Sequence, residues 1–240
     1  MNIRWEKEYT LRGSDFDCFG NVRAAALLDL FQDAAGRHAE ELGVGFDAML
    51  EKELLWVITR VKLQVAAPLS RYQTVRVCTW PLKPSRLNFR REYRIEDLTG
   101  RALVKGSSEW MIIHSKERRV VSTQNIYPFS EGFPEELALE EKLLKVPLVE
   151  ETGEGVLVLP TFTDLDSNGH VNNTKYVDFV LNAAVPQAEE RLYSLQIDYR
   201  KEVMAGEPLA VYCHKNGNEL LAKGLNETGT TMFACRMTYF

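Results

Sequence analysis

One short segment of the chain gathers the residue types that carry out acid–base chemistry. From Thr163 to Phe179 the sequence is TDLDSNGHVNNTKYVDF, in which carboxylates, carboxamides, a glycine and a histidine precede a helical pattern. The N-terminus of a helix offers free backbone N–H groups and the positive end of the helix dipole, which suit an anion or an oxyanion. A carboxylate, an amide and an imidazole beside it could polarise a carbonyl group and activate a water molecule.

A degenerate copy of this segment lies near the start of the chain. From Ser14 to Leu30 the sequence is SDFDCFGNVRAAALLDL. Aligned without a gap, residues 15–41 and 164–190 share ten identities in 27 positions, whereas unrelated segments of this length share roughly one or two. The chain therefore contains an internal duplication, and equivalent positions in its two copies can be compared.

The comparison separates residues that build the loop from residues that could do chemistry. Asn168 is replaced by Phe19 in the first copy, and His170 is replaced by Asn21. Residues that only capped the helix would be needed in both copies, so Asn168 and His170 are candidates for chemistry. The residues that a loop leading into a helix requires are the same in both copies, namely Asp15/Asp164, Asp17/Asp166 and Gly20/Gly169.

Other polar residues are better explained by local structure. Asp and Asn are favoured at helix N-caps and in turns, so capping or turn roles are expected for Asp164, Asn172 and Asn173. His38 lies on the apolar face of the first predicted helix. It is expected to be a packed, hydrogen-bonded histidine and not a catalytic one.

Each copy is predicted to be a strand, the polar loop, a helix and then an antiparallel meander of about four long strands. In the first half the strands cover residues 3–11, 56–65, 73–80, 88–97 and 102–114. Their counterparts in the second half cover 155–162, 193–200, 208–217, 219–227 and 231–240. A long sheet with one apolar helix should curl around that helix, and two such halves can pair edge to edge.

The predicted fold class is therefore α+β, with two tandem repeats. The N-terminal repeat covers residues 1–121 and the C-terminal repeat covers residues 151–240. Residues 122–150, rich in proline, glycine and charge, are predicted to connect them, with a short helical stretch.

Composition limits the function. The 240 residues are 45% hydrophobic and carry a net charge of −5, which argues against a general nucleic-acid or membrane binder. No apolar run approaches the roughly 18 residues that span a bilayer, and MNIRWEKEYT lacks the apolar region of a signal peptide. Four scattered cysteines without a C-x-x-C pair predict free thiols in a reducing cytoplasm, with neither a metal site nor a disulfide framework.

These motifs resemble the acyl-acyl carrier protein thioesterase family. DLDSNGHVNNTKYVDF is similar to the signature of the family, and LQIDYRKEV is similar to its later strand with a catalytic glutamate. DFDCFGNVRAAALLDLFQDAAGRHAEELG, WVITRVKLQV and VCTWP in the first half fit as well. The resemblance covers nearly the whole chain and implies a double hot-dog fold, each half a long antiparallel sheet wrapped around one helix. It also implies release of a fatty acid from the phosphopantetheine thioester of acyl carrier protein, which terminates fatty acid synthesis, without a cofactor.

The resemblance places the catalytic set on Asp166, Asn168, His170 and Glu202. Glu202 also differs between the copies, because Pro68 occupies the equivalent position in the first half. The plant members carry a cysteine directly after this glutamate, whereas this chain has Val203. A thiol mechanism is therefore not available at that position, and carboxylates and water must do the chemistry.

The first half is expected to bind the acyl chain, so that the protein has a single active site. The apolar helix face of Ala24, Leu27, Leu28 and Phe31 mixes small and large residues and is the predicted substrate-binding wall. The simpler alternative is that these side chains only fill the core.

Three alternatives remain open from the sequence. The chain could be an acyl-CoA thioesterase, a dehydratase of the same fold, or a non-catalytic acyl-thioester-binding regulator. A dehydratase uses a histidine with one carboxylate, so the additional Asn168 and second carboxylate favour hydrolysis. A regulator would not need Asn168, His170 and Glu202, and no DNA-binding segment is visible. Acyl carrier protein is the expected partner, and a homodimer is compatible with the sequence.

Overall fold

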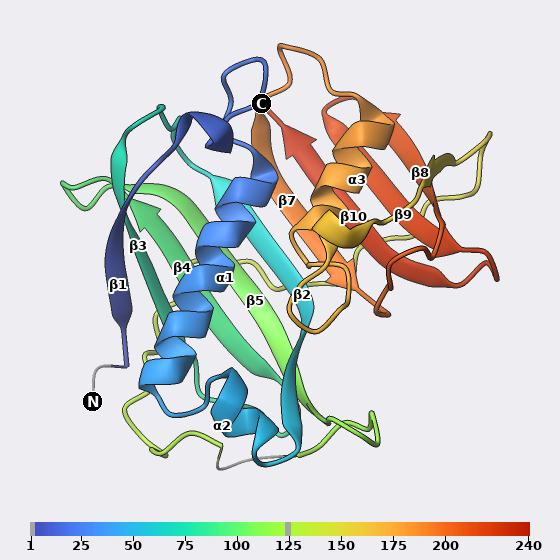
Figure 1. Cartoon of the computed structure of the whole chain (residues 1–240). Helices are drawn as coiled ribbons and strands as arrows, with labels where there is room; N and C mark the ends of the chain where they lie inside the picture. Colours follow the sequence, from blue (N-terminus) through green and yellow to red (C-terminus); the bar gives the residue numbers. More distant parts are fainter. Residues whose placement is uncertain (1–2, 123–125) are drawn as a thin grey trace.

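A single antiparallel sheet of ten strands carries two long helices on one face (Figure 1). The computed structural model describes residues 3–122 and 126–240. The first-half strands are β1 (Trp5–Thr10), β2 (Leu54–Val65), β3 (Thr74–Pro81), β4 (Phe89–Glu96) and β5 (Ala102–His114). The second-half strands are β6 (Val156–Val158), β7 (Leu192–Tyr199), β8 (Leu209–Asn216), β9 (Glu219–Asn226) and β10 (Thr231–Tyr239). The helices are α1 (Ala24–Glu41), α2 (Phe46–Leu50) and α3 (Lys175–Ala184), and the 3-10 turns are η1 (Gly13–Asp15) and η2 (Phe162–Asp164).

The order of the strands shows the duplication directly. It is β1-β3-β4-β5-β2-β7-β10-β9-β8-β6, so the second half repeats the order of the first in reverse. The halves join where β2 pairs with β7 in antiparallel register, with Lys62 opposite Gln196 at the centre of the shared ladder. This arrangement confirms the predicted α+β fold with one sheet continuous through both halves, the double hot-dog arrangement.

Two details of the topology differ from the sequence-based expectation. The strands after each helix are not a simple meander, because β2 pairs with β5 and β7, and β3 pairs with β1 and β4. The short helix α2 was not expected. Its five residues give too short an apolar pattern to be distinguished from a loop.

Equivalent positions at the ends of β2 and β7 can be fixed from backbone hydrogen bonds. The two N–H groups that follow β2 at residues 66 and 67 donate to one carbonyl in β5, and the two that follow β7 at residues 200 and 201 donate to one carbonyl in β10. The next residue is Pro68 in the first half and Glu202 in the second. The structure therefore supports the alignment that compares these two residues.

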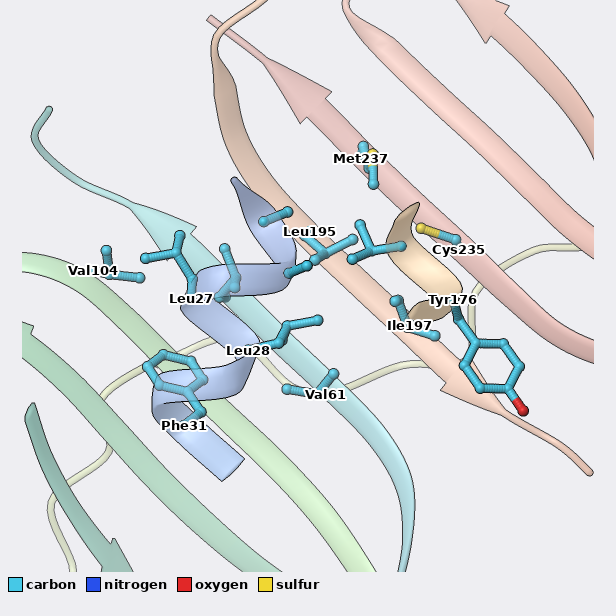
Figure 2. Packing of buried hydrophobic residues seen from close by; sticks show 14 of the residues in the cluster. Leu27, Leu28, Phe31, Val61, Val104, Tyr176, Leu195, Ile197, Cys235 and Met237 are labelled. Carbon is cyan, nitrogen blue, oxygen red and sulfur yellow. The ribbon is translucent and has the colours of Figure 1, made fainter. Parts of the chain in front are cut away.

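The helices bury their apolar faces against the sheet. Leu27 and Phe31 of α1 and Tyr176 of α3 point toward the strands among Val61, Leu195 and other buried residues (Figure 2). Burial of each such aliphatic side chain stabilises the fold by about 1.5–3 kcal/mol. The faces that sequence periodicity marked as apolar are therefore the ones that form the core.

The two helices differ in length, 18 residues for α1 and 10 for α3. Helix α3 ends because Val185 takes a left-handed conformation and Pro186 follows it. Three of the ten identities, at Ala188, Glu189 and Glu190, therefore lie beyond the helix and have no structural equivalence to their partners in α1. The additional turns of α1 belong to the first half alone.

The connector crosses the face of the sheet that lies opposite the helices (Figure 1). Residues 126–150 contain no helix, contrary to the expected short helical stretch, while residues 123–125 of the predicted connector lie outside the described residues. Side chains of the sheet bind the backbone of the connector: Glu92 accepts from the N–H of Ala138, and Arg60 donates to the carbonyl of Leu143 at 2.8 Å. With its polar groups bound in this way, the segment stays extended.

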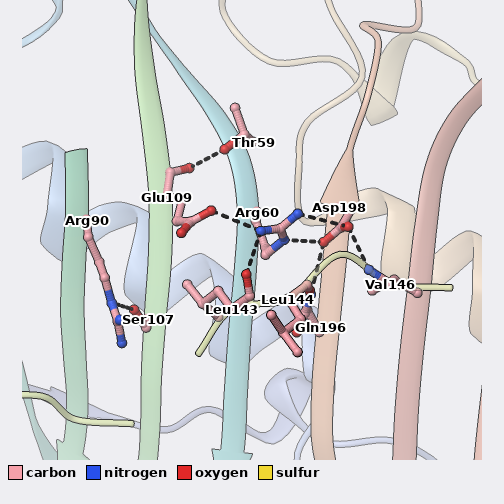
Figure 3. A network of polar contacts seen from close by, with 10 residues as sticks. All are labelled: Thr59, Arg60, Arg90, Ser107, Glu109, Leu143, Leu144, Val146, Gln196 and Asp198. Carbon is pink, nitrogen blue, oxygen red and sulfur yellow. Dashed lines mark hydrogen bonds and ion pairs between the residues drawn. The ribbon is translucent and has the colours of Figure 1, made fainter. Parts of the chain in front are cut away.

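A buried ion pair joins the halves and the connector (Figure 3). Arg60 of β2 donates to both carboxylate oxygens of Asp198 of β7, at 2.5 and 3.1 Å, and to Glu109 of β5 at 3.0 Å. Asp198 also accepts from the backbone N–H of Val146 at 2.8 Å. The side chain of Asp198 is only 5% exposed, so its charge depends on these partners.

In the part of the chain that the structure describes, none of the helices is both long and apolar enough to cross a membrane.

Asp198→Ala is expected to lower the free energy of unfolding by about 3 kcal/mol, because removing one partner of a buried pair leaves the other charge uncompensated. Equilibrium urea unfolding measures the loss. Glu8→Gln is the control, since it removes the exposed pair with Arg76 and should change stability by less than about 0.5 kcal/mol. Equal effects of the two changes would contradict the role given to Asp198.

Candidate active site

The polar loops before α1 and α3 have the same backbone structure. In the first copy Oδ1 of Asp17 accepts from the N–H groups two and four residues later, at 2.9 and 2.8 Å. In the second copy Oδ1 of Asp166 accepts from the same two positions, at 2.8 and 3.2 Å. Gly20 and Gly169 take φ values of +82° and +79°, which favour glycine. The conserved residues of the duplication are therefore those that build the loop.

Asp166 thus has a structural role in the loop, whether or not it also takes part in catalysis. Its carboxylate also lines the cavity described below, and within residues 3–122 and 126–240 its Oδ2 accepts no hydrogen bond. One oxygen shapes the loop and the other is available to a ligand.

The capping roles predicted for neighbouring residues are confirmed for two of three. Asp164 forms a capping box with Thr161, accepting from its backbone N–H at 2.8 Å. Asn172 accepts from the backbone N–H of Thr174 at the start of α3, at 3.1 Å. Asn173 instead lines the cavity, and its backbone carbonyl accepts from the hydroxyl of Tyr199.

The loop is attached to the segment that follows β7. The N–H of Val171 donates to the carbonyl of Val203 at 2.8 Å, and His170 forms a β-bridge with Met204. This pairing brings Nε2 of His170 within 3.6 Å of Oε2 of Glu202, an ion-pair distance that is too long for a hydrogen bond. The side chain of Val203 is fully buried in the core, so that position faces away from the site.

A residue of the first half completes this group. Arg118 lies in the turn after β5 with a positive φ of 53° and forms an ion pair with Glu202. Arg200 and Lys201, which directly precede Glu202, are exposed and line the same cavity. Sequence analysis missed these three cations. The adjacent pair could have been noticed beside Glu202, but nothing in the sequence places Arg118 there.

A cavity of about 910 Å³ connects this group with the first half. Asp166, Asn168, His170 and Glu202 all border it. The structure therefore brings the four predicted residues to one cavity, although Glu202 is more than thirty residues from the loop. Apolar side chains of the first half form much of the remaining wall, among them Met49, Trp56, Phe89 and Trp110.

The helix wall of the cavity differs from the predicted one. Ala24, Leu27, Leu28 and Phe31 are all buried, and none of them borders the large cavity. Leu28 and Phe31 border only a neighbouring space of about 20 Å³.

The later part of α1 faces the large cavity instead, through Ala35, Gly36 and Ala39. Gly36 and Ala39 belong to the turns that α3 lacks. The first turns of α1 lie against α3 and the centre of the sheet, where packing excludes a ligand.

His38 is a buried, hydrogen-bonded residue as expected, since it contacts Arg91 and is fully buried.

The cysteines lie away from the chemistry. None of the four lines the cavity. Burial raises the pKa of Cys78 and of Cys213 to about 11 and raises that of Cys235 as well, which keeps these thiols protonated. Cys18 is exposed in the degenerate loop.

Comparison with known families matches both halves. The model described as acyl-ACP thioesterase N-terminal domain covers residues 2–127, and the acyl-ACP thioesterase C-terminal domain covers residues 152–236. The palmitoyl-acyl carrier protein thioesterase of Gossypium hirsutum is 30% identical over 218 residues, which cover 82% of this chain and 52% of that protein. The chain spans about half the length of the curated relatives it matches.

Solved structures share the fold over the whole chain. The 12:0-ACP thioesterase from Umbellularia californica has a TM-score of 0.87 at 20% identity, covering 100% of this chain and 98% of that one. An acyl-ACP thioesterase from Bacteroides thetaiotaomicron has a TM-score of 0.86 at 20% identity, covering 99% and 98%. At this level of identity the likeness concerns the fold.

A variant with serine or alanine at Cys18, Cys78, Cys213 and Cys235 is expected to keep the turnover of the wild type, provided it folds. The reason is that three of the thiols are held protonated and none reaches the cavity. Turnover and circular dichroism are measured on the same preparation. Loss of turnover in a folded variant would point back to a thiol mechanism.

Proposed function

Because the chain belongs to the acyl-ACP thioesterase family, we propose that it hydrolyses fatty acyl thioesters of acyl carrier protein to free fatty acid and holo carrier protein. In this role it terminates fatty acid synthesis. One observation carries the proposal: Asn168, His170 and Glu202 border one cavity with an apolar wall, while Phe19, Asn21 and Pro68 hold the equivalent positions in the first half. The polar residues at these positions are not needed for the fold, which both halves share.

The reaction joins a water oxygen to the thioester carbonyl carbon and breaks the carbon–sulfur bond. Glu202 accepts a proton from water, and His170 lies close enough to orient Glu202 or to receive the proton from it. Asn168, in the loop before α3, is the donor for the carbonyl oxygen as negative charge develops. The proton taken from water leaves with the thiol of the product, so atoms and charge balance. Direct attack by Asp166 or Glu202 is the alternative, with water hydrolysing the resulting anhydride.

Arg118 has a definite part in this scheme. Its guanidinium pairs with Glu202 in the free protein, so this carboxylate already has a partner before substrate binds. A substrate phosphate that draws Arg118 away would release Glu202 for catalysis.

The cations suggest how the donor is bound. Arg118, Arg200 and Lys201 lie at the exposed side of the cavity near Glu202. The thioester of acyl carrier protein is carried on a phosphopantetheine arm, whose phosphate such a cluster can bind. An acyl-CoA thioester carries the same arm, so the acyl-CoA thioesterase alternative rests on the same cluster. Parallel assays with both donors decide between them.

Glu202→Gln and His170→Ala are each expected to lower turnover on acyl carrier protein thioesters at least a hundredfold. Glu202→Gln removes the group that accepts the proton from water, and His170→Ala removes the side chain beside it. The hydrogen bonds of Asp166 within the loop remain in both variants. Steady-state hydrolysis is measured on graded acyl chains with both donors, and thermal unfolding shows that the variants fold. Near-normal turnover of both variants would refute the assignment, and binding without hydrolysis by the wild type would favour a regulator.

Ala35→Leu is expected to shift the preferred acyl chain to shorter lengths, because Ala35 borders the cavity. Each methylene that loses its place costs about 0.8 kcal/mol, or roughly fourfold in kcat/KM. Ala24→Leu, within the packed start of α1, is the matched change, expected to lower stability and leave the chain-length profile unchanged. A shifted chain-length profile in Ala24→Leu with an unchanged profile in Ala35→Leu would support the sequence-based assignment. That assignment places the acyl site at Ala24, Leu27, Leu28 and Phe31.

A further inference from the structure

A buried arginine lies in the inner wall of the cavity. Arg91 of β4 is 6% exposed and points to the helix side of the sheet, between the buried positions Phe89 and Tyr93 of the same strand. It borders the cavity together with Phe89, Met49 and Tyr127, each of which is also buried. A cation is an unexpected component among these buried apolar neighbours.

None of the side chains that contact this cation is a carboxylate, among the residues that the structure describes. Nη1 of Arg91 lies 3.0 Å from Nδ1 of His38 and donates to Oγ1 of Thr79 at 3.2 Å. The hydroxyl of Tyr127 is a third neighbour. No carboxylate of residues 3–122 or 126–240 forms an ion pair with Arg91. A buried cation without a counter-anion is costly, and Arg91 borders the cavity.

The second half shows that the fold does not require this cation. Val61 of β2 and Leu195 of β7 are equivalent residues. Across the neighbouring strand, the paired positions lead from Val61 to Arg91 in the first half and from Leu195 to Leu220 in the second, so Arg91 and Leu220 are equivalent. By the same register Thr79 corresponds to Cys213. Leu220 and Cys213 are less polar than Arg91 and Thr79, so the second half has no buried cation at this position.

Arg91 belongs to a strand that lies apart from the one next to Glu202. Glu202 follows β7, and β4 is three strands away through β5 and β2, which is about 14 Å across the sheet. With its thioester beside Glu202, an acyl chain would therefore reach Arg91 with its distal part.

We propose that Arg91 binds an oxygen-bearing distal end of the acyl chain, and that the substrates include ω-carboxyacyl thioesters. This inference rests on the proposed function in naming a thioester substrate. A carboxylate supplies the counter-anion that Arg91 lacks and accepts charge-assisted hydrogen bonds from its remaining donors. Such bonds in a dry site discriminate strongly between a ligand with the acceptor and one without it.

Binding is measured first, because it does not depend on hydrolysis. The probes are monomethyl dodecanedioate, which has a free carboxylate at one end, and methyl dodecanoate, which has none. The wild type is expected to bind the first at least tenfold more tightly by calorimetry. In Arg91→Met the two affinities should become nearly equal.

Two further variants locate the effect. Arg94→Met changes an arginine of the same strand on the opposite face, where it pairs with Glu136, and should keep the wild-type preference. Arg200→Met tests whether the carboxylate binds at the mouth instead. Loss of the preference in Arg200→Met, with retention in Arg91→Met, overturns the proposal.

Hydrolysis is then compared for ω-carboxydodecanoyl and dodecanoyl thioesters of acyl carrier protein. The ratio of their kcat/KM values should fall at least tenfold in Arg91→Met. A wild type that hydrolyses dodecanoyl thioesters with no preference in either assay refutes this inference and leaves the proposed function standing. A wild type that binds the carboxylate probe preferentially but hydrolyses neither thioester refutes the proposed function alone. If Arg91→Met does not fold, the wild-type binding ratio and its retention in Arg200→Met together decide the proposal.

Discussion

The pairing of β2 with β7 is the interaction on which the rest of the structure depends. It turns two five-stranded sheets into one and covers the edge that each half would otherwise expose. The ion pair of Arg60 with Asp198 crosses this junction, and Asp198 also holds the connector through Val146. One buried carboxylate thus fixes both halves and the segment between them, so the relative position of the halves is set at this place.

A shared cavity follows from that junction. Glu202 extends from the end of β7, Arg118 from the end of β5, and the polar loop lies across the segment after β7. The apolar wall comes largely from the first half, where α1 has 18 residues against the 10 of α3. The polar residues of the second half therefore face the apolar cavity of the first half. Neither half could provide this combination alone.

The duplication separates structural from chemical roles within one motif. Asp17 and Asp166 bind the same two backbone N–H groups of their loops, so this aspartate is explained by folding in both copies. Phe19 and Asn21 show that the loop folds without Asn168 and His170. The same comparison applies to Arg91, whose equivalent Leu220 shows that the sheet folds without a cation there.

The sequence by itself determined the repeat, the strands and the polar loop, because these depend on local periodicity and on comparison of two copies. The comparison also singled out Asn168, His170 and Glu202, whereas Asp166, which both copies share, was predicted for catalysis only from the resemblance to the family. It could not determine which face of α1 borders empty space, since Leu28 and Ala35 are both apolar and buried and differ only in what packs against them. It also gave no sign of Arg118 beside Glu202 or of Arg91 in the cavity wall. Those positions follow from strand register and from the junction of the halves, which bring together residues far apart in the chain. Only the tertiary structure decided them, because burial and charge pairing are properties of the packed sheet and not of any single segment.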